Sequence, residues 1–159
     1  MPMMSRRSFV GHAAGAGLAL AGGRSLWAAV RSPAVSPTMT IYMSPTCGCC
    51  AKWVDHVKAA GFTTEVHEEQ DMDVVKQSLG VPADMRSCHT AQVDKYLIEG
   101  HVPAEDIKKL LDQKPSAAGL AAPGMPASSP GMAVPGEPHE AYDILVFQRD
   151  GSSKVFAKR

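Results

Sequence analysis

Three of the four cysteines in this chain lie within four residues, in the run Cys47-Gly48-Cys49-Cys50. The fourth, Cys88, lies far along the chain in the phrase Ser87-Cys88-His89-Thr90. Cys47 and Cys50 have the two-residue spacing of a redox dithiol, whereas Cys49 adds a soft metal ligand that such a pair does not need. The cluster therefore predicts sulfur chemistry, either thiol redox exchange or the binding of a thiophilic metal.

The cysteine run lies where a strand is expected to end and a helix to begin. Residues 39–43 predict a short strand, and residues 50–60 predict a helix because their apolar side chains recur at helical spacing. At the first turn of a helix, the helix dipole and the unpaired backbone N–H groups favour thiolate over thiol. We therefore expect the thiols of this run to be reactive.

The order of the predicted elements indicates an α/β fold. After the first helix the sequence predicts strand 62–67, helix 71–79, strands 91–93 and 96–99, and helix 103–113. This is the order of a thioredoxin or glutaredoxin core, in which the cysteine motif begins the first helix. In that fold the loop before the third strand approaches the motif, and here this loop carries Cys88 in place of the usual cis-proline. We therefore expect the four thiols to form one pocket.

The C-terminal third has a different composition. Residues 114–139 are rich in Pro, Gly, Ala, Ser and Met without apolar periodicity, and they predict a long loop. Strands at 142–148 and 154–157, joined by a turn at Asp150-Gly151, predict a C-terminal β-hairpin. The basic pair Lys158-Arg159 is expected to be solvated.

The N-terminus predicts export. Ser5-Arg6-Arg7-Ser8-Phe9-Val10 is a twin-arginine phrase, and a weakly apolar run rich in Ala and Gly follows it to Gly23. That run is too short for a stable membrane span. We predict a signal peptide and short linker over residues 1–36, with cleavage near residues 29–37. Residues 37–159 would then be one domain in the bacterial periplasm, an oxidising compartment.

The charge balance and the ligand types indicate which molecules or ions the protein is expected to bind. The 16 Lys and Arg balance the 16 Asp and Glu, and no basic cluster interleaves with aromatics, so nucleic acid is not an expected partner. Crowded thiolates suit Cu(I), and each sulfur can bridge two ions. Zinc is the competing metal, but the chain has a single C-x2-C pair, and the adjacent Cys49 and Cys50 do not easily bind one tetrahedral ion. The ligand pattern favours copper.

Further side chains are weaker ligand candidates. His89 follows Cys88 directly, and it would either bind metal or position the loop. Met125 and Met132 offer thioethers in the long loop, although methionine usually fills gaps in packing. His101 lies where a strand passes into a helix, a place more typical of packing than of metal binding.

Four phrases carry a family resemblance. They are Cys47-Gly48-Cys49-Cys50, Ser87-Cys88-His89-Thr90, Glu99-Gly100-His101-Val102-Pro103-Ala104, and Pro123-Gly124-Met125-Pro126 with Ser129-Pro130-Gly131-Met132. In this order they resemble the CopG-type copper-resistance proteins, which are exported, thioredoxin-like and metal-binding. The resemblance implies periplasmic copper handling, with Cu(I) held as a multinuclear thiolate cluster by Cys47, Cys49, Cys50 and Cys88. Copper oxidoreductase activity, other periplasmic copper-handling proteins and a thiol redox partner are compatible with it.

Two other functions stay open. A thiol–disulfide oxidoreductase would use Cys47 as nucleophile and Cys50 as resolving thiol. Cys49, Cys88 and the missing cis-proline are unnecessary or unfavourable for that activity. The last alternative is a passive fold in which the cysteines form two structural disulfides, for which adjacent cysteines are an awkward arrangement. Whether the protein is an enzyme is not decided by the sequence.

Overall fold

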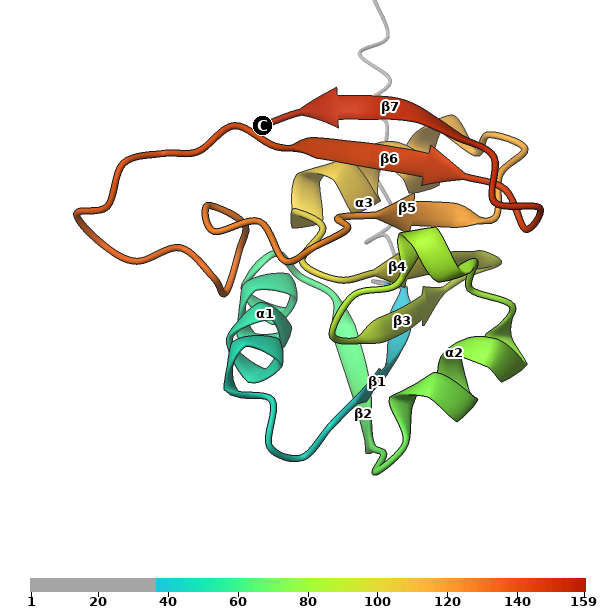
Figure 1. The fold of residues 1–159 in the computed structure, drawn as a ribbon, viewed down its shortest axis with the longest axis horizontal. Helices are drawn as coiled ribbons and strands as arrows, with labels where there is room; N and C mark the ends of the chain where they lie inside the picture. The colour runs from blue at the N-terminus through green and yellow to red at the C-terminus, as the bar shows by residue number, and fades with distance from the viewer. Residues whose placement is uncertain (1–36) are drawn as a thin grey trace, which may run out of the picture. The chain divides into compact units, whose positions relative to one another are not determined.

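The computed structural model describes residues 37–159, so the predicted signal peptide and linker at 1–36 lie outside the described residues. Residues 37–159 form one mixed seven-stranded sheet with strand order β2-β1-β3-β4-β5-β6-β7, together with three α helices (Figure 1). The elements are β1 (Thr38–Met43), α1 (Gly48–Ala59), β2 (Thr63–Glu68), α2 (Met72–Leu79), the 3-10 helix η1 (Ala83–Met85), β3 (Thr90–Val93), β4 (Tyr96–Glu99), α3 (Ala104–Gln113), β5 (Gly119–Ala121), β6 (Asp143–Phe147) and β7 (Ser153–Lys158). No helix within this part of the chain has the length and apolar character needed to cross a membrane. The predicted α/β class is confirmed.

The end of β1 and the start of β3 lie side by side, and this position decides where the cysteines meet. β1 pairs with β2 in parallel and with β3 antiparallel, with Tyr42 opposite Thr90. Because antiparallel neighbours run in opposite directions, the turn from β1 to Cys47 and the loop from Cys88 into β3 meet at the same end of the sheet. The register of β1 and β3 therefore brings together residues that are far apart in sequence.

Two apolar cores cover the two faces of the sheet. The larger core packs α1 and α3 against one face, with Trp53, Val57 and Ile107 among its buried residues. The smaller core lies on the other face, where Met85 of η1 packs with Leu97, Phe147 and neighbouring side chains. All four residues of β4 are buried: Tyr96 and Ile98 lie in the larger core and Leu97 in the smaller one, whereas the Glu99 carboxylate is buried outside both. The sheet is thus a rigid support for the segments at its ends.

β5 corrects the prediction that residues 114–139 are loop throughout. It pairs in parallel with β4 and antiparallel with β6. A Cβ at Gly119 would overlap the Leu97 carbonyl oxygen, so glycine is needed for this close backbone approach. A three-residue Gly-Leu-Ala strand shows neither polar–apolar alternation nor β-branched residues, and so its sequence resembles loop.

The C-terminal residue, Arg159, contacts the first turn of α3. β6 and β7 pair antiparallel, and the Arg159 backbone exchanges two hydrogen bonds with Tyr142. The Arg159 guanidinium pairs with the carboxylate of Asp106, which is buried in the first turn of α3. The expectation that Arg159 is solvated is therefore wrong, because a buried carboxylate that is far from it in sequence needs a cation.

Candidate metal centre

The cysteine run forms the N-terminal turn of α1. Cys47 is the residue before the helix, and Cys49 and Cys50 lie in its first turn. No side chain caps this end of α1, and its first turn has no acidic residue. The unpaired backbone N–H groups and the positive end of the helix dipole therefore act on the sulfur atoms, and both favour thiolates.

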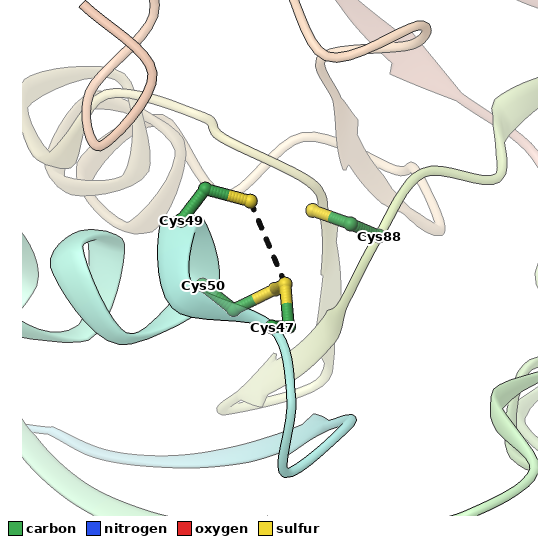
Figure 2. A group of neighbouring side chains, drawn as sticks. All are labelled: Cys47, Cys49, Cys50 and Cys88. Carbon is green, nitrogen blue, oxygen red and sulfur yellow. Dashed lines mark hydrogen bonds between the residues drawn. A yellow bond between two sulfur atoms is a disulfide. The ribbon is translucent and has the colours of Figure 1, made fainter.

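All four cysteine sulfurs lie within 4.8 Å of one another. Figure 2 shows Cys49 and Cys88 pointing toward one another, with Cys47 and Cys50 beside them. The Sγ atoms of Cys47 and Cys49 are 3.5 Å apart. Cys50 is fully buried, whereas the other three are partly exposed. The expected pocket of four sulfurs, three from α1 and one from the loop before β3, is thus present as an arrangement of side chains.

Two of the four cysteines are joined. Cys47 and Cys50 form a disulfide with a Cα–Cα distance of 5.3 Å, whereas Cys49 and Cys88 are free thiols. A protein with two structural disulfides would also pair Cys49 with Cys88, so the passive alternative does not describe this structure. A site that uses all four sulfurs requires reduction of Cys47–Cys50 by two electrons.

Cys88 lies between the thiol cluster and two buried histidines. Its Sγ is 3.0 Å from His101 Nε2 and 3.3 Å from His89 Nδ1. Burial, and next the neighbouring Cys49, raise the pKa of the Cys88 thiol to about 11. Cys88 is therefore a protonated thiol at neutral pH.

The two histidines differ in their surroundings. His89 packs on the Trp53 ring with centroids 4.3 Å apart, and its Nε2 has no hydrogen-bond partner among the described residues. His101 Nδ1 lies 2.7 Å from the carbonyl oxygen of Pro130. Burial lowers the pKa of both imidazoles, so both are neutral at physiological pH and have a lone pair available for a metal.

Residues 126–133 of the long loop form a turn on the cysteine helix, which we call the strap. Ser129 is buried, and its hydroxyl donates to the Pro126 carbonyl. Gly131 has φ of +86°, and a Cβ there would lie 2.8 Å from the Cys49 carbonyl oxygen and 2.9 Å from the Trp53 nitrogen. The strap therefore contacts the backbone of α1, and any residue larger than glycine at position 131 would push it away.

The methionine candidates lie in the same long loop. Met125 is 44% exposed and has a positive φ. Met132, partly buried, lines a surface hollow of about 450 Å³ together with Ala133, Glu137 and His139. Copper binding by either thioether stays a prediction.

A buried ion pair positions the loop that carries Cys88. Lys76 Nζ lies 2.5 Å from Glu99 Oε1 and 2.9 Å from Thr90 Oγ1. Glu99 also accepts hydrogen bonds from the Ser87 backbone N–H and the Thr90 hydroxyl, each at 2.6 Å. Glu99 therefore binds the residue before Cys88 and the residue two places after it.

The sequence patterns did not predict this network, the contacts of the strap or the position of His101. Lys76 lies in an amphipathic helix in which a lysine is normally solvated. The sequence does contain one indication of the network, which is Glu99 directly before Gly100-His101. A glutamate at the end of a buried strand requires a charged or hydrogen-bonding partner. For the strap, the available signal is the Pro-Gly-Met phrase that occurs twice in the long loop.

Comparison with known proteins agrees with this architecture. A family profile described as "Protein of unknown function, DUF411" matches residues 85–132, and no curated protein matches the chain. Two solved structures, "Copper resistance protein copG", forms 2 and 1, are each 42% identical to it. Form 2 aligns over 78% of this chain and 98% of its own, with a TM-score of 0.72. Form 1 aligns over 77% of this chain and 96% of its own, with a TM-score of 0.70.

The fold and the site together define a mixed α/β protein with clustered thiols at a helix N-terminus. The chain belongs to the CopG-type copper-resistance family.

Proposed function

We propose that this protein binds copper as Cu(I) in the bacterial periplasm and contributes to copper resistance. The observation that carries the proposal is the gathering of four cysteine sulfurs within 4.8 Å, three at the start of α1 and one on the facing loop. Copper is here the protein's cargo. Cys47, Cys49, Cys50 and Cys88 are the proposed ligands, and His89, Met125 and Met132 are candidates for completing the site.

The spacing of the sulfurs supports a bridged site. Two thiolates bound to one ion at about 2.3 Å lie about 3.8 Å apart at tetrahedral angles. The sulfurs of Cys47 and Cys50 reach this separation only after their disulfide is reduced and they move apart. The other separations, 3.5 Å between Cys47 and Cys49 and at most 4.8 Å overall, need only small side-chain movements. Cu(I) is soft and prefers thiolates, and four thiolates that bridge neighbouring ions hold more than one Cu(I). We therefore propose a multinuclear thiolate cluster.

We also infer that β2, β1, β3 and β4 with α1 and α3 form a thioredoxin-like core, and that β6 and β7 are a C-terminal hairpin. Support comes from the parallel β1–β2 pair, the antiparallel β1–β3 and β3–β4 pairs, and the cysteine motif at the start of α1. The antiparallel β6–β7 pair supports the hairpin.

Anaerobic titration with Cu(I) tests the copper function. The fully reduced chain is expected to bind more than one Cu(I) in competition with a chelator and to show charge transfer in the near ultraviolet. The form with the Cys47–Cys50 disulfide is expected to bind fewer ions because two of the four sulfurs are no longer thiolates. If the reduced chain takes up one Zn²⁺ and no Cu(I), the site is structural zinc and the copper proposal is wrong.

The Cys47–Cys50 disulfide favours a second candidate function, thiol–disulfide exchange. It lies at an uncapped helix N-terminus, where the helix field stabilises the thiolate that leaves when the bond is reduced. The two functions are compatible. Oxidation of the Cys47 and Cys50 thiols to the disulfide releases two electrons and two protons, and those electrons reduce two Cu(II) to two Cu(I).

We propose export by the twin-arginine route, as the Arg6-Arg7 phrase predicts. Replacement of both arginines by lysine in the full chain is expected to leave precursor in the cytoplasm, since the export machinery reads the arginine pair. Immunoblots of fractionated cells measure this distribution. Unchanged accumulation of the variant in the periplasm would contradict the assignment.

A further inference from the structure

Cys88 belongs to two groups of potential ligands. Its Sγ lies within 4.8 Å of the other three cysteine sulfurs, and a second group within the same limit joins it to ring nitrogens of His89 and His101. The two groups share only Cys88. The group of four sulfurs therefore adjoins two buried histidines that offer nitrogen ligands.

The ring nitrogens of His101 have separate roles. A carbonyl oxygen only accepts hydrogen bonds, so the 2.7 Å contact with the Pro130 oxygen requires that His101 Nδ1 carries the proton. In the neutral imidazole the lone pair is then on Nε2, which lies 3.0 Å from Cys88 Sγ. Metal-binding histidines have this arrangement, with one nitrogen free for the ion and the other donating to a carbonyl that orients the ring.

We propose that His101 binds copper through Nε2, at an ion shared with Cys88, and that the strap holds its ring in the ligating orientation. This inference rests on the proposed copper function. It adds an uncharged nitrogen ligand to a site otherwise made of thiolates. When the ion binds, Cys88 gives up its proton to solvent, and neutral His101 contributes a lone pair without releasing a proton.

The distances agree with a shared ion after a small movement. With metal–sulfur and metal–nitrogen bonds of about 2.3 and 2.0 Å at a tetrahedral angle, the two ligand atoms lie about 3.5 Å apart. The observed 3.0 Å is the separation of a hydrogen bond from the Cys88 thiol to Nε2. Replacement of this proton by a metal requires the two atoms to separate by roughly half an ångström.

Contacts on both sides restrict the ring of His101. On one side, Trp53 Nε1 donates a hydrogen bond of 2.9 Å to the carbonyl of Val102, the residue after His101, and so holds the backbone that carries the ring. On the other side is the strap, where a Cβ at Gly131 would lie 3.3 Å from His101 Nδ1 as well as against the α1 backbone. The same segment of the strap thus contacts the helix that carries the cysteines and the imidazole that faces Cys88.

His89 is the less suitable histidine. Its Nδ1 is 3.3 Å from the sulfur of the adjacent residue, Cys88, and its Nε2 has no partner in the described part of the chain. No carbonyl therefore fixes its tautomer, and its ring packs against Trp53. The proposal accordingly assigns the nitrogen ligand to His101.

Wild-type protein gives the first test. In reduced protein labelled with ¹⁵N-histidine, we expect the His101 Nε2 resonance to change from that of an unprotonated nitrogen to that of a metal-bound nitrogen when Cu(I) is added. The Nδ1–H signal is expected to persist. X-ray absorption of the copper-loaded protein is expected to show a nitrogen scatterer beside sulfur. If Nε2 stays unperturbed at full copper loading, the Cys88–His101 contact is only a structural hydrogen bond and the proposal is overturned.

Variants give the second test. His101→Gln is expected to lose the nitrogen scatterer and to lower the affinity for at least one Cu(I) by about tenfold or more, whereas His89→Gln keeps the scatterer. Gly131→Ala is expected to weaken the same ion by about 10- to 100-fold through displacement of the strap. Its matched control is Gly136→Ala, which has a similar φ of +92° but no atom within 4 Å of the added Cβ.

The outcomes separate this inference from the copper function. If His101→Gln binds Cu(I) like wild type and keeps the nitrogen scatterer, the inference is wrong while the four-cysteine site stands. If wild-type protein binds no Cu(I), the copper function itself fails. Equal losses in the Gly131→Ala and Gly136→Ala variants would show that backbone strain, and not contact with the site, is responsible, and would overturn the role of the strap.

Discussion

Replacement of Cys88 by alanine is expected to lower the number of Cu(I) ions bound per chain and to weaken the remaining binding by more than about tenfold. Cys88 is the only sulfur that the described loop before β3 contributes to the pocket, and it lies between the α1 thiols and His101. Without it the bridging network lacks one corner, and water does not replace a soft ligand for Cu(I). Competition titration against a Cu(I) chelator measures the change, and cells that express the variant should lose protection against copper.

The same variant distinguishes copper binding from thiol–disulfide exchange. Disulfide reduction needs only Cys47 and Cys50, so Cys88→Ala and Cys49→Ala should both keep insulin reductase activity while both lose copper. Circular dichroism of each variant controls for folding. Full copper binding by both variants, with reductase activity that depends only on Cys47 and Cys50, would show that Cys49 and Cys88 are not needed as copper ligands, and it would favour the oxidoreductase function.

Lys76→Met is expected to destabilise the reduced, metal-free protein by about 3–5 kcal/mol at neutral pH. Lys76 and Glu99 are 3% and 0% exposed, so the substitution leaves a buried carboxylate without its cation. Urea unfolding measures the loss. Lys52→Met on the exposed side of α1 is the control, and it should change the free energy of unfolding by less than about 0.5 kcal/mol.

A double variant identifies the cause of that destabilisation. With Glu99→Gln added, the side chain at position 99 is neutral and still able to accept from the Ser87 N–H, so most of the lost stability should return. If the double variant is as unstable as Lys76→Met alone, the loss comes from the packing of the lysine stem. Recovery of the free energy of unfolding in the double variant would show that the Lys76–Glu99 charge pair stabilises the protein around the loop that carries Cys88.

Local patterns in the sequence predicted the elements of the first half of the domain. Asp71 caps α2 by accepting hydrogen bonds from the Asp73 and Val74 N–H groups, and Gly80 ends the helix in the left-handed conformation. These signals depend only on residues within one helical turn, which is why they can be recognised without a structure. The cysteine run at the start of α1 was predictable on the same grounds. The position of Cys88 beside it was predictable from the order of the elements.

The remaining features depend on contacts between residues far apart in sequence. β5 exists because β4 and β6 offer unpaired backbone groups on both sides of Gly119, not because Gly-Leu-Ala favours a strand. Likewise, the Lys76 ammonium is buried where Glu99 and Thr90, both distant in sequence, accept its hydrogen bonds.

The sequence by itself thus determined the clustering of the cysteines, the α/β class and the helix that presents three of them. The tertiary structure alone decided that the strap lies on α1, whereas the Cys47–Cys50 disulfide joins the two cysteines whose spacing had already indicated a dithiol pair. The tertiary structure also decided that His101 faces Cys88. The physical reason is the sequence separation over which each interaction acts. Periodicity and capping act between residues a few positions apart, whereas the surroundings of a sulfur or an imidazole depend on sheet register and on where a distant loop packs.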